Sequence, residues 1–249
     1  MPTATLIFVL AVVFVASLIR STFGFGEALI SVPLLALVLP IAVAAPLAVL
    51  LSITIAAVVI VQDWRHIHLR SAIWLLLPTF LGIPLGLLLL TRVDDHIVKG
   101  ILGAVIALFA AYLFWRRSPP RLHTDNAGWL LGCGLTAGIL GGAYGMNGPP
   151  LVIYGAMRGW SPQHFRATLQ GYFLPASLAS MVGYWVSGLW VPEVTHDYLI
   201  SLVTVLPAIL LGRWLNRRMH GDAFLKYVYV GLQLTGLLLL LQASRVIAL

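Results

Sequence analysis

Long apolar runs, separated by short polar stretches, dominate the chain. The runs over 42–61, 71–90, 97–115 and 223–243 approach or reach the ~20 residues that a helix needs to cross the hydrocarbon core of a bilayer. None of them alternates between apolar and polar positions, as the strands of a transmembrane barrel do. The pattern therefore predicts an all-α polytopic membrane protein.

Two stretches interrupt this pattern with glycine and proline. They are "GFGEALISVPLL" (24–35) and "GGAYGMNGPPLV" (141–152), and each runs from a glycine cluster to a Pro-Leu pair nine positions later. Similarity at a fixed separation predicts an internal repeat. The matched positions are Gly24 with Gly141, Pro33 with Pro150, and Leu34 with Leu151.

A second pair of similar segments supports the repeat. Residues 84–99 and 210–226 each contain the glycine-bearing end of a span, a charged turn and a lysine that opens the next span. We therefore predict a single transmembrane domain, residues 1–249, in which each of two copies has about four helices and a broken first segment. The division is repeat one at 1–115, a polar linker at 116–126 and repeat two at 127–249.

The basic residues favour one of two arrangements of these repeats. If the first segment of each repeat crosses the membrane once, basic loops fall on both sides. If each first segment folds back as a hairpin, the loops 62–70, 116–126, 158–166 and 213–222 share one face, which then holds twelve of the fifteen Lys and Arg. Basic loops gather on the cytoplasmic face, so the hairpins, and with them an inverted-topology repeat, are favoured.

The fold is predicted to have eight spans, or up to ten if the hairpins cross. Residues 6–19 and 127–140 would then be fourteen-residue helices of ~21 Å, short of a ~30 Å core. Only 9% of the residues are charged, against about 25% in a soluble domain. Because the net charge of +7 lies mostly in short loops, it indicates membrane orientation and no nucleic-acid partner.

The two interrupted stretches indicate a binding site. Irregular backbone survives at membrane depth only where protein or water satisfies its polar groups, and paired broken segments in two repeats point to the substrate site of a transporter. Unpaired N–H groups at a helix N-terminus attract anions. Pro149 and Pro150 suit the first turn of a helix, and Asn147 offers both a donor and an acceptor. The alternative is that these glycines only allow close helix packing.

The two stretches also resemble a known family. "STFGFGEALISVPLLALVLP" and "GILGGAYGMNGPPLVIYGAMRGWSPQHFRATLQGYF" are similar to the two repeat signatures of the TauE/SafE sulfite exporter family, and the resemblance covers nearly the whole chain. It implies a multi-pass carrier of the cell inner membrane that moves a small sulfur-containing anion such as sulfite, sulfoacetate or another organosulfonate. The family usually has a small residue where this chain has Glu27.

Several polar residues in or beside the broken stretches are candidates for the substrate site. Glu27 is ionisable at membrane depth, so it is either a proton-coupling residue or the structural partner of Arg20. Arg166 offers a planar guanidinium that matches a sulfonate, although an interfacial arginine is the alternative. The full set of predicted substrate-binding residues is Ser21, Thr22, Gly24, Gly26, Glu27, Gly141, Gly142, Asn147, Gly148, Tyr154, Arg166 and Gln170.

Each of the remaining candidates has a structural alternative. Gln170 shares the helix face of Arg166, four residues earlier. Ser21 and Thr22 either donate to the substrate or bond back to their own helix. Tyr154 either contacts the substrate or packs.

Motifs for other chemistry are missing from the sequence. His66 and His68 have no evident third ligand, so we predict no metal, and no motif predicts an enzyme or a cofactor. We therefore predict a secondary transporter for a small sulfur-containing anion that works by alternating access, and a homodimer suits so small a bundle. The alternatives are a proton-coupled carrier of another small ion or carboxylate, and a non-transporting membrane subunit.

Overall fold

The structure, a computed structural model, describes residues 3–63, 69–115, 126–160 and 162–218, together with residues 122 and 124. These residues form nine helices and no strand, and five of the helices are long and apolar enough to cross a membrane. The prediction of an all-α polytopic membrane protein is therefore confirmed. The helices are α1 (Thr3–Phe23), α2 (Glu27–Leu35), α3 (Ile41–Asp63), α4 (Leu69–Arg92), α5 (Asp95–Trp115), α6 (Ala127–Tyr144), α7 (Gly148–Met157), α8 (Pro162–Val186) and α9 (Pro192–Arg218).

Each half of the chain begins with a long helix followed by a short one. The backbone leaves α1 at Gly24 (φ 86°) and enters α2 through Gly26 (φ 99°), and it leaves α6 at Gly145 (φ 65°) before α7 begins. These positive φ values lie in a region that glycine adopts without a steric cost. The predicted breaks are present, and Pro149 and Pro150 occupy the first turn of α7 as expected.

The helices before the breaks are longer than predicted. α1 has 21 residues and α6 has 18, against the fourteen expected for each, and at 1.5 Å per residue α1 reaches about 31 Å, enough to cross the bilayer core. The prediction of two half-length first helices is therefore wrong. Gly141 and Gly142 stay inside α6, because a helical glycine costs only ~1 kcal/mol relative to alanine, and close packing offsets that cost.

The residue-by-residue alignment of the two halves also needs correction. The break after α1 begins at Gly24 and the break after α6 at Gly145, and α2 and α7 begin at Glu27 and Gly148. The equivalent positions are thus 121 residues apart, one helical turn more than the 117 that pairs Gly24 with Gly141. The alignment by glycine identity paired Gly24 with Gly141, but Gly141 is helical. The glycines that end α1 and α6 are Gly24 and Gly145, which have positive φ.

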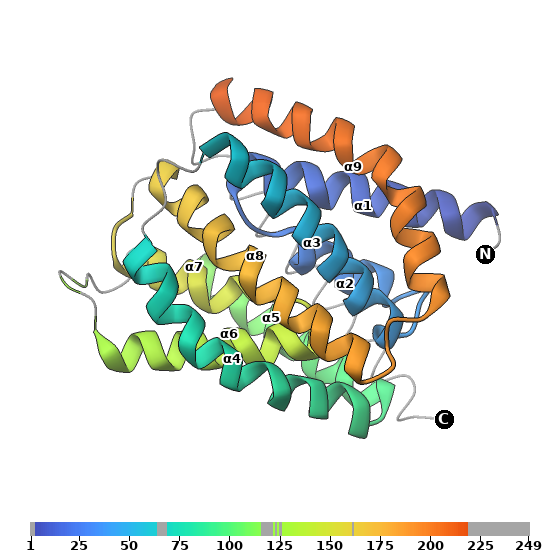
Figure 1. Cartoon of the computed structure of the whole chain (residues 1–249), viewed down its shortest axis with the longest axis horizontal. Coiled ribbons are helices and arrows are strands. Elements are labelled where there is room, and N and C mark those ends of the chain that lie inside the picture. Colours follow the sequence, from blue (N-terminus) through green and yellow to red (C-terminus); the bar gives the residue numbers. More distant parts are fainter. Residues whose placement is uncertain are drawn as a thin grey trace.

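Close helix packing joins the two halves of the chain at two corresponding contacts. Gly86 of α4 lies against the backbone of Ile139 in α6, and Gly212 of α9 lies against Leu18 and Ser21 in α1, each so tightly that a methyl group would collide. Figure 1 shows α1 beside α9 along one side of the molecule and α4 beside α6 along the other, with α3 and α8 between them. Small residues allow such close approach between membrane helices.

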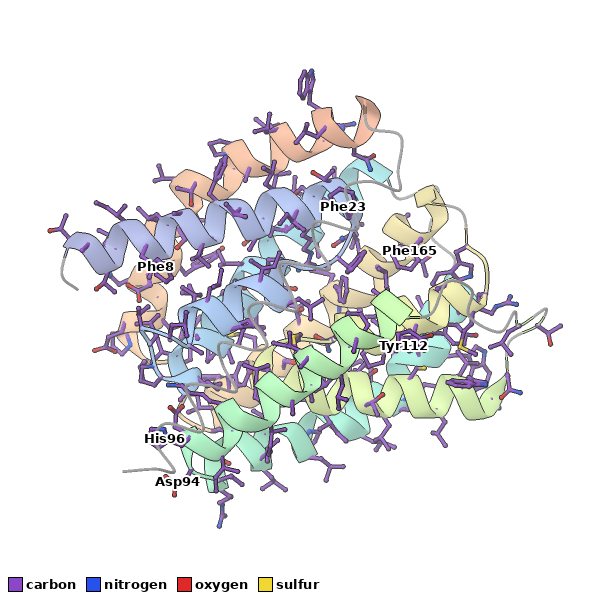
Figure 2. All side chains as sticks on the ribbon, turned by 180° about the vertical axis from the view of Figure 1, so that it is seen from behind. Phe8, Phe23, Asp94, His96, Tyr112 and Phe165 are labelled. Atoms are coloured by element: carbon purple, nitrogen blue, oxygen red, sulfur yellow. The ribbon has the colours of Figure 1, made fainter. Side chains whose placement is uncertain are left out.

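The direction of the helices agrees with the hairpin arrangement. In Figure 1, α1, α3 and α9 run from right to left, whereas α6, α8 and α4, their counterparts by order in the chain, run from left to right. The C-terminal ends of α3 and α9 and the N-terminal ends of α4, α6 and α8 consequently lie on the left side. Figure 2 shows Asp94, between α4 and α5, and His96, in the first turn of α5, on the opposite side from Tyr112 and Phe165. The repeat boundaries and the orientation in the membrane stay predictions.

Candidate functional site

The two backbone breaks meet at one small cavity. Residues 25–29 of the first break and residues 145–148 of the second line it, together with Arg20, Ser52 and Phe173. The cavity is only about 20 Å³, which is room for about one water molecule. Segments that are 120 residues apart in the chain therefore form one polar pocket inside the helix bundle.

The first break directs free backbone donors at the cavity. Ile30 N–H donates to the Gly26 carbonyl at 3.2 Å, which is the first helical bond of α2. The N–H groups of Glu27, Ala28 and Leu29 precede that bond and have no acceptor within the helix, and all three residues line the cavity. The N-terminus of α2 thus presents several donors and a partial positive charge to the cavity.

The second break contributes fewer backbone N–H donors to the cavity. Pro149 and Pro150 have no N–H to offer, so α7 brings mainly the Gly148 N–H and the Asn147 side chain. Asn147 is 3% exposed, and its Nδ2 lies near the Tyr172 hydroxyl without making a hydrogen bond within 3.5 Å. The side chain lies directly against Gly141, where any Cβ would collide with Nδ2. Gly141 therefore leaves the space that Asn147 occupies.

A buried guanidinium is the strongest charge at the cavity. Arg20 is 3% exposed, and its Nη1 donates to Glu27 Oε2 at 2.8 Å and to Ser52 Oγ at 2.7 Å. Its Nη2 donates to Gln170 Oε1 at 3.0 Å, and its guanidinium carbon lies 4.8 Å from the ring centroid of Phe173. A ring face at that distance stabilises a cation. Arg20 Nε, by contrast, is buried without a partner.

The partners of Arg20 connect the two halves of the chain. Gln170 of α8 accepts from Arg20 and donates through Nε2 to the Gly24 carbonyl at 2.7 Å, so it ties α8 to the first break. The hydroxyls of Ser52 in α3 and Ser177 in α8 lie 2.9 Å apart. A charged and hydrogen-bonded network therefore joins α1, α2, α3 and α8 behind the cavity.

The structure brings some of the predicted site residues together. Gly26, Glu27, Asn147 and Gly148 line the cavity, and Gly24 and Gln170 lie directly behind it. Of the two alternatives for Glu27, the ion pair with Arg20 is present, and Ser31 Oγ donates to the other oxygen of the same carboxylate at 3.3 Å.

The other predicted site residues lie elsewhere. Ser21 faces Gly212 of α9, and Thr22 Oγ1 bonds back to the Leu18 carbonyl at 2.7 Å. Gly142 packs on the backbone of Ile83 in α4, which is the close-packing role. Tyr154 is buried and packs edge-on against Trp160, with ring centroids 5.8 Å apart. None of these side chains lines the cavity.

Three predictions fall on residues that the structure does not describe. The Arg166 side chain is one of them, although its backbone belongs to α8, and His66 and His68 are the others. Within the described ranges, no group of three or more His, Cys, Asp and Glu side chains could hold a metal ion.

Outside the two breaks, three residues line the cavity that the sequence did not predict as site residues: Arg20, Ser52 and Phe173. Arg20 was weighed only as the partner of Glu27, although an arginine inside an apolar stretch is itself a signal. Ser52 belongs to the long apolar helix α3 and Phe173 to the less apolar α8, and neither residue gives a signal of its own in the sequence. They come to the cavity because α3 and α8 pack against each other beside α1 and α2.

A bundle of membrane-spanning helices in which two broken segments meet at a buried polar cavity is the architecture of a membrane transporter. Comparison with protein families narrows this class. Residues 9–239 match the family described as "Sulfite exporter TauE/SafE", and the chain therefore belongs to that family. No curated protein and no solved structure matches the chain significantly.

Proposed function

We propose that the protein is a secondary carrier for a small sulfur-containing anion, such as sulfite, sulfoacetate or another organosulfonate. The anion binds between the two broken segments, and one half of the bundle rocks against the other to give alternating access. We place the protein in the cell inner membrane, with the lipid bilayer as its surroundings and a homodimer as its assembly. The family supports the substrate class, and the cavity supports the binding site.

The observation that carries this proposal is the convergence of donors on one cavity. Arg20 offers a guanidinium, and the first turn of α2 offers the N–H groups of Glu27, Ala28 and Leu29. A sulfite or sulfonate group has three oxygens that spread its negative charge, so several donors from different directions suit it well. The unpartnered Nδ2 of Asn147 and Nε of Arg20 are further donors close by.

The size of the cavity indicates a closed state. A volume of about 20 Å³ holds about one water molecule, whereas a sulfonate group has four heavy atoms. Substrate therefore enters only when the two breaks separate. Movement at the contact between α3 and α8, which carries the Ser52–Ser177 hydrogen bond, is the simplest way to open the cavity.

Flux through liposomes that contain only the purified chain tests the proposal. Wild-type protein should move sulfite or sulfoacetate down a gradient. Arg20→Lys keeps the charge but loses the planar fork, so we expect at least a tenfold loss of kcat/KM, corresponding to about 1.4 kcal/mol. Arg92→Lys is the matched control, because Arg92 is exposed at the end of α4, and it should transport normally.

Two outcomes would contradict the proposal. If Arg20→Lys transports as well as Arg92→Lys, the anion does not bind at this cavity. If the wild-type chain moves neither anion, the protein is a non-transporting subunit or a carrier of another solute.

A carboxylate carrier is the second candidate. The Glu27 carboxylate lies 2.8 Å from Arg20, and this contact supports a carboxylate as a possible ligand of the same guanidinium. Competition decides between the two classes: a sulfonate carrier should lose sulfoacetate flux to excess methanesulfonate, whereas a carboxylate carrier should lose it to excess acetate.

A further inference from the structure

Glu27 occupies the place on Arg20 where a substrate anion would bind. Its Oε2 lies 2.8 Å from Nη1 of Arg20, and both side chains are almost completely buried. A carboxylate and a sulfonate present similar acceptor oxygens to a guanidinium. With only about 20 Å³ of space left, the cavity cannot hold both groups against Arg20, so a substrate reaches the guanidinium only when Glu27 moves away.

If the Glu27 carboxylate moved away from Arg20 while still charged, the carboxylate would have no compensating charge. Arg20 from α1 is the cation that faces Glu27 among the described residues, and the other groups around it are neutral: Ser31 of α2, Ser52 of α3 and Asn147 of the second break. On α5, which also packs on α2, Lys99 pairs with its neighbour Asp95 at 2.9 Å.

A buried carboxylate without a partner is strongly unfavourable. A proton on Glu27 removes the charge at the moment when the substrate takes its place.

We propose that the carrier binds one proton with each anion, and that Glu27 is the proton site. The substrate anion replaces the Glu27 carboxylate on Arg20, and Glu27 takes up a proton from the water on the side to which the cavity is open. This inference rests on the proposed function, because it assumes that an anion binds at Arg20.

The charge balance explains why the two events are linked. In the empty site, the positive Arg20 and the negative Glu27 cancel. In the loaded site, Arg20 and a monovalent anion cancel, and the protonated Glu27 is neutral. The cavity therefore carries no net charge in either state when it closes. Binding of an anion without a proton would instead leave one buried negative charge in excess. The coupled movement is a symport of one proton with one anion.

Methanesulfonate is the probe that tests this inference, because it stays a monoanion across the pH range in which Glu27 titrates. The affinity of purified wild-type protein for methanesulfonate should fall about tenfold for each unit by which the pH rises. This slope applies over the pH range in which binding requires the uptake of one proton. In liposomes, an internal pH dye should record about one proton for each anion.

Glu27→Gln removes the titrating group and keeps the side-chain size. This variant should bind methanesulfonate with an affinity that does not change with pH, and it should exchange anions across the membrane without moving protons. Glu193→Gln is the matched control, because Glu193 is exposed in the first turn of α9. It should keep the wild-type pH dependence and proton count.

The outcomes separate this inference from the proposed function. If wild-type protein transports methanesulfonate and Glu27→Gln still moves one proton per anion, the inference is overturned and the proposed function stands. If wild-type transport carries no proton at all, the inference is likewise overturned. If the wild-type chain neither binds nor moves either anion, both fail. If sulfite alone is transported, the difference between the proton counts of wild type and Glu27→Gln at the same pH decides, because the proton that sulfite itself carries is the same for both. A difference of about one proton supports the inference, and equal counts overturn it.

Discussion

The fit between Gly141 and Asn147 gives the sharpest test of the cavity's construction. A Cβ at position 141 would collide with Nδ2 of Asn147, so Gly141→Ala must push the asparagine out of its place. Overpacking of this kind costs ~1–3 kcal/mol, and alanine returns up to ~1 kcal/mol through its helix propensity. We expect a net destabilisation of about 1 kcal/mol, or a fall in Tm of ~2–4 °C for a chain of this size.

Gly132→Ala is the matched control in the same helix. A Cβ at Gly132 meets nothing within 4 Å, so this variant should gain only helix propensity, and its Tm should rise by a few degrees. Comparing the two variants separates the effect of the collision from the general effect of alanine in α6. The same preparations should also differ in transport, because the displaced Asn147 of Gly141→Ala disturbs the cavity.

A double-mutant cycle isolates the contact itself. In an Asn147→Ala background the collision disappears, so Gly141→Ala should become stabilising, as Gly132→Ala is. The interaction energy between positions 141 and 147 should then be ~1–3 kcal/mol. The assay is thermal unfolding in detergent, followed by tryptophan fluorescence. If Gly141→Ala costs the same with and without Asn147, or raises the Tm as Gly132→Ala does, the reasoning is refuted.

Two further predictions concern the other close or strained glycines. Gly26→Ala and Gly159→Ala both place alanine at a positive φ, of 99° and 63°, and each variant should lose about 1 kcal/mol or more of stability. Of the two, Gly26 alone lines the cavity, so only Gly26→Ala should also reduce anion flux. Equal flux in the two variants would contradict the role of Gly26 at the cavity. Gly212→Ala drives a methyl group into Leu18 and Ser21 of α1, so its Tm should fall well below that of Gly132→Ala; an unchanged Tm would show that α1 and α9 do not pack as described.

Local backbone chemistry explains which parts of the fold were predictable. Hydropathy identified the spans, and the glycine and proline clusters identified both breaks, because these residues act through backbone rules that hold in any fold. The length of α6 was not predictable in this way. Gly141 and Gly142 interrupt the sequence pattern but not the helix, since what keeps them helical is the packing of α4 and the side chain of Asn147.

The candidate site was predictable only in part, for a related reason. Glu27 and Asn147 belong to the breaks themselves, so the sequence marked them. Ser52 and Phe173 are ordinary helix residues that belong to neither break, and only the packing of α3 and α8 places them at the cavity. Arg20 lies one turn before its helix ends, where a basic residue is typical of membrane orientation. Its burial and its bond to Gln170, 150 residues away, give it a different role.

The location of a bound anion tests the central claim most directly. Selenite resembles sulfite, and its selenium atom can be located by anomalous scattering in crystals of the protein. We expect a selenium peak between residues 26–29 and 145–148, within hydrogen-bond reach of Arg20, with Glu27 displaced from the guanidinium. A peak elsewhere in the bundle, or two breaks that do not face a common cavity, would contradict it.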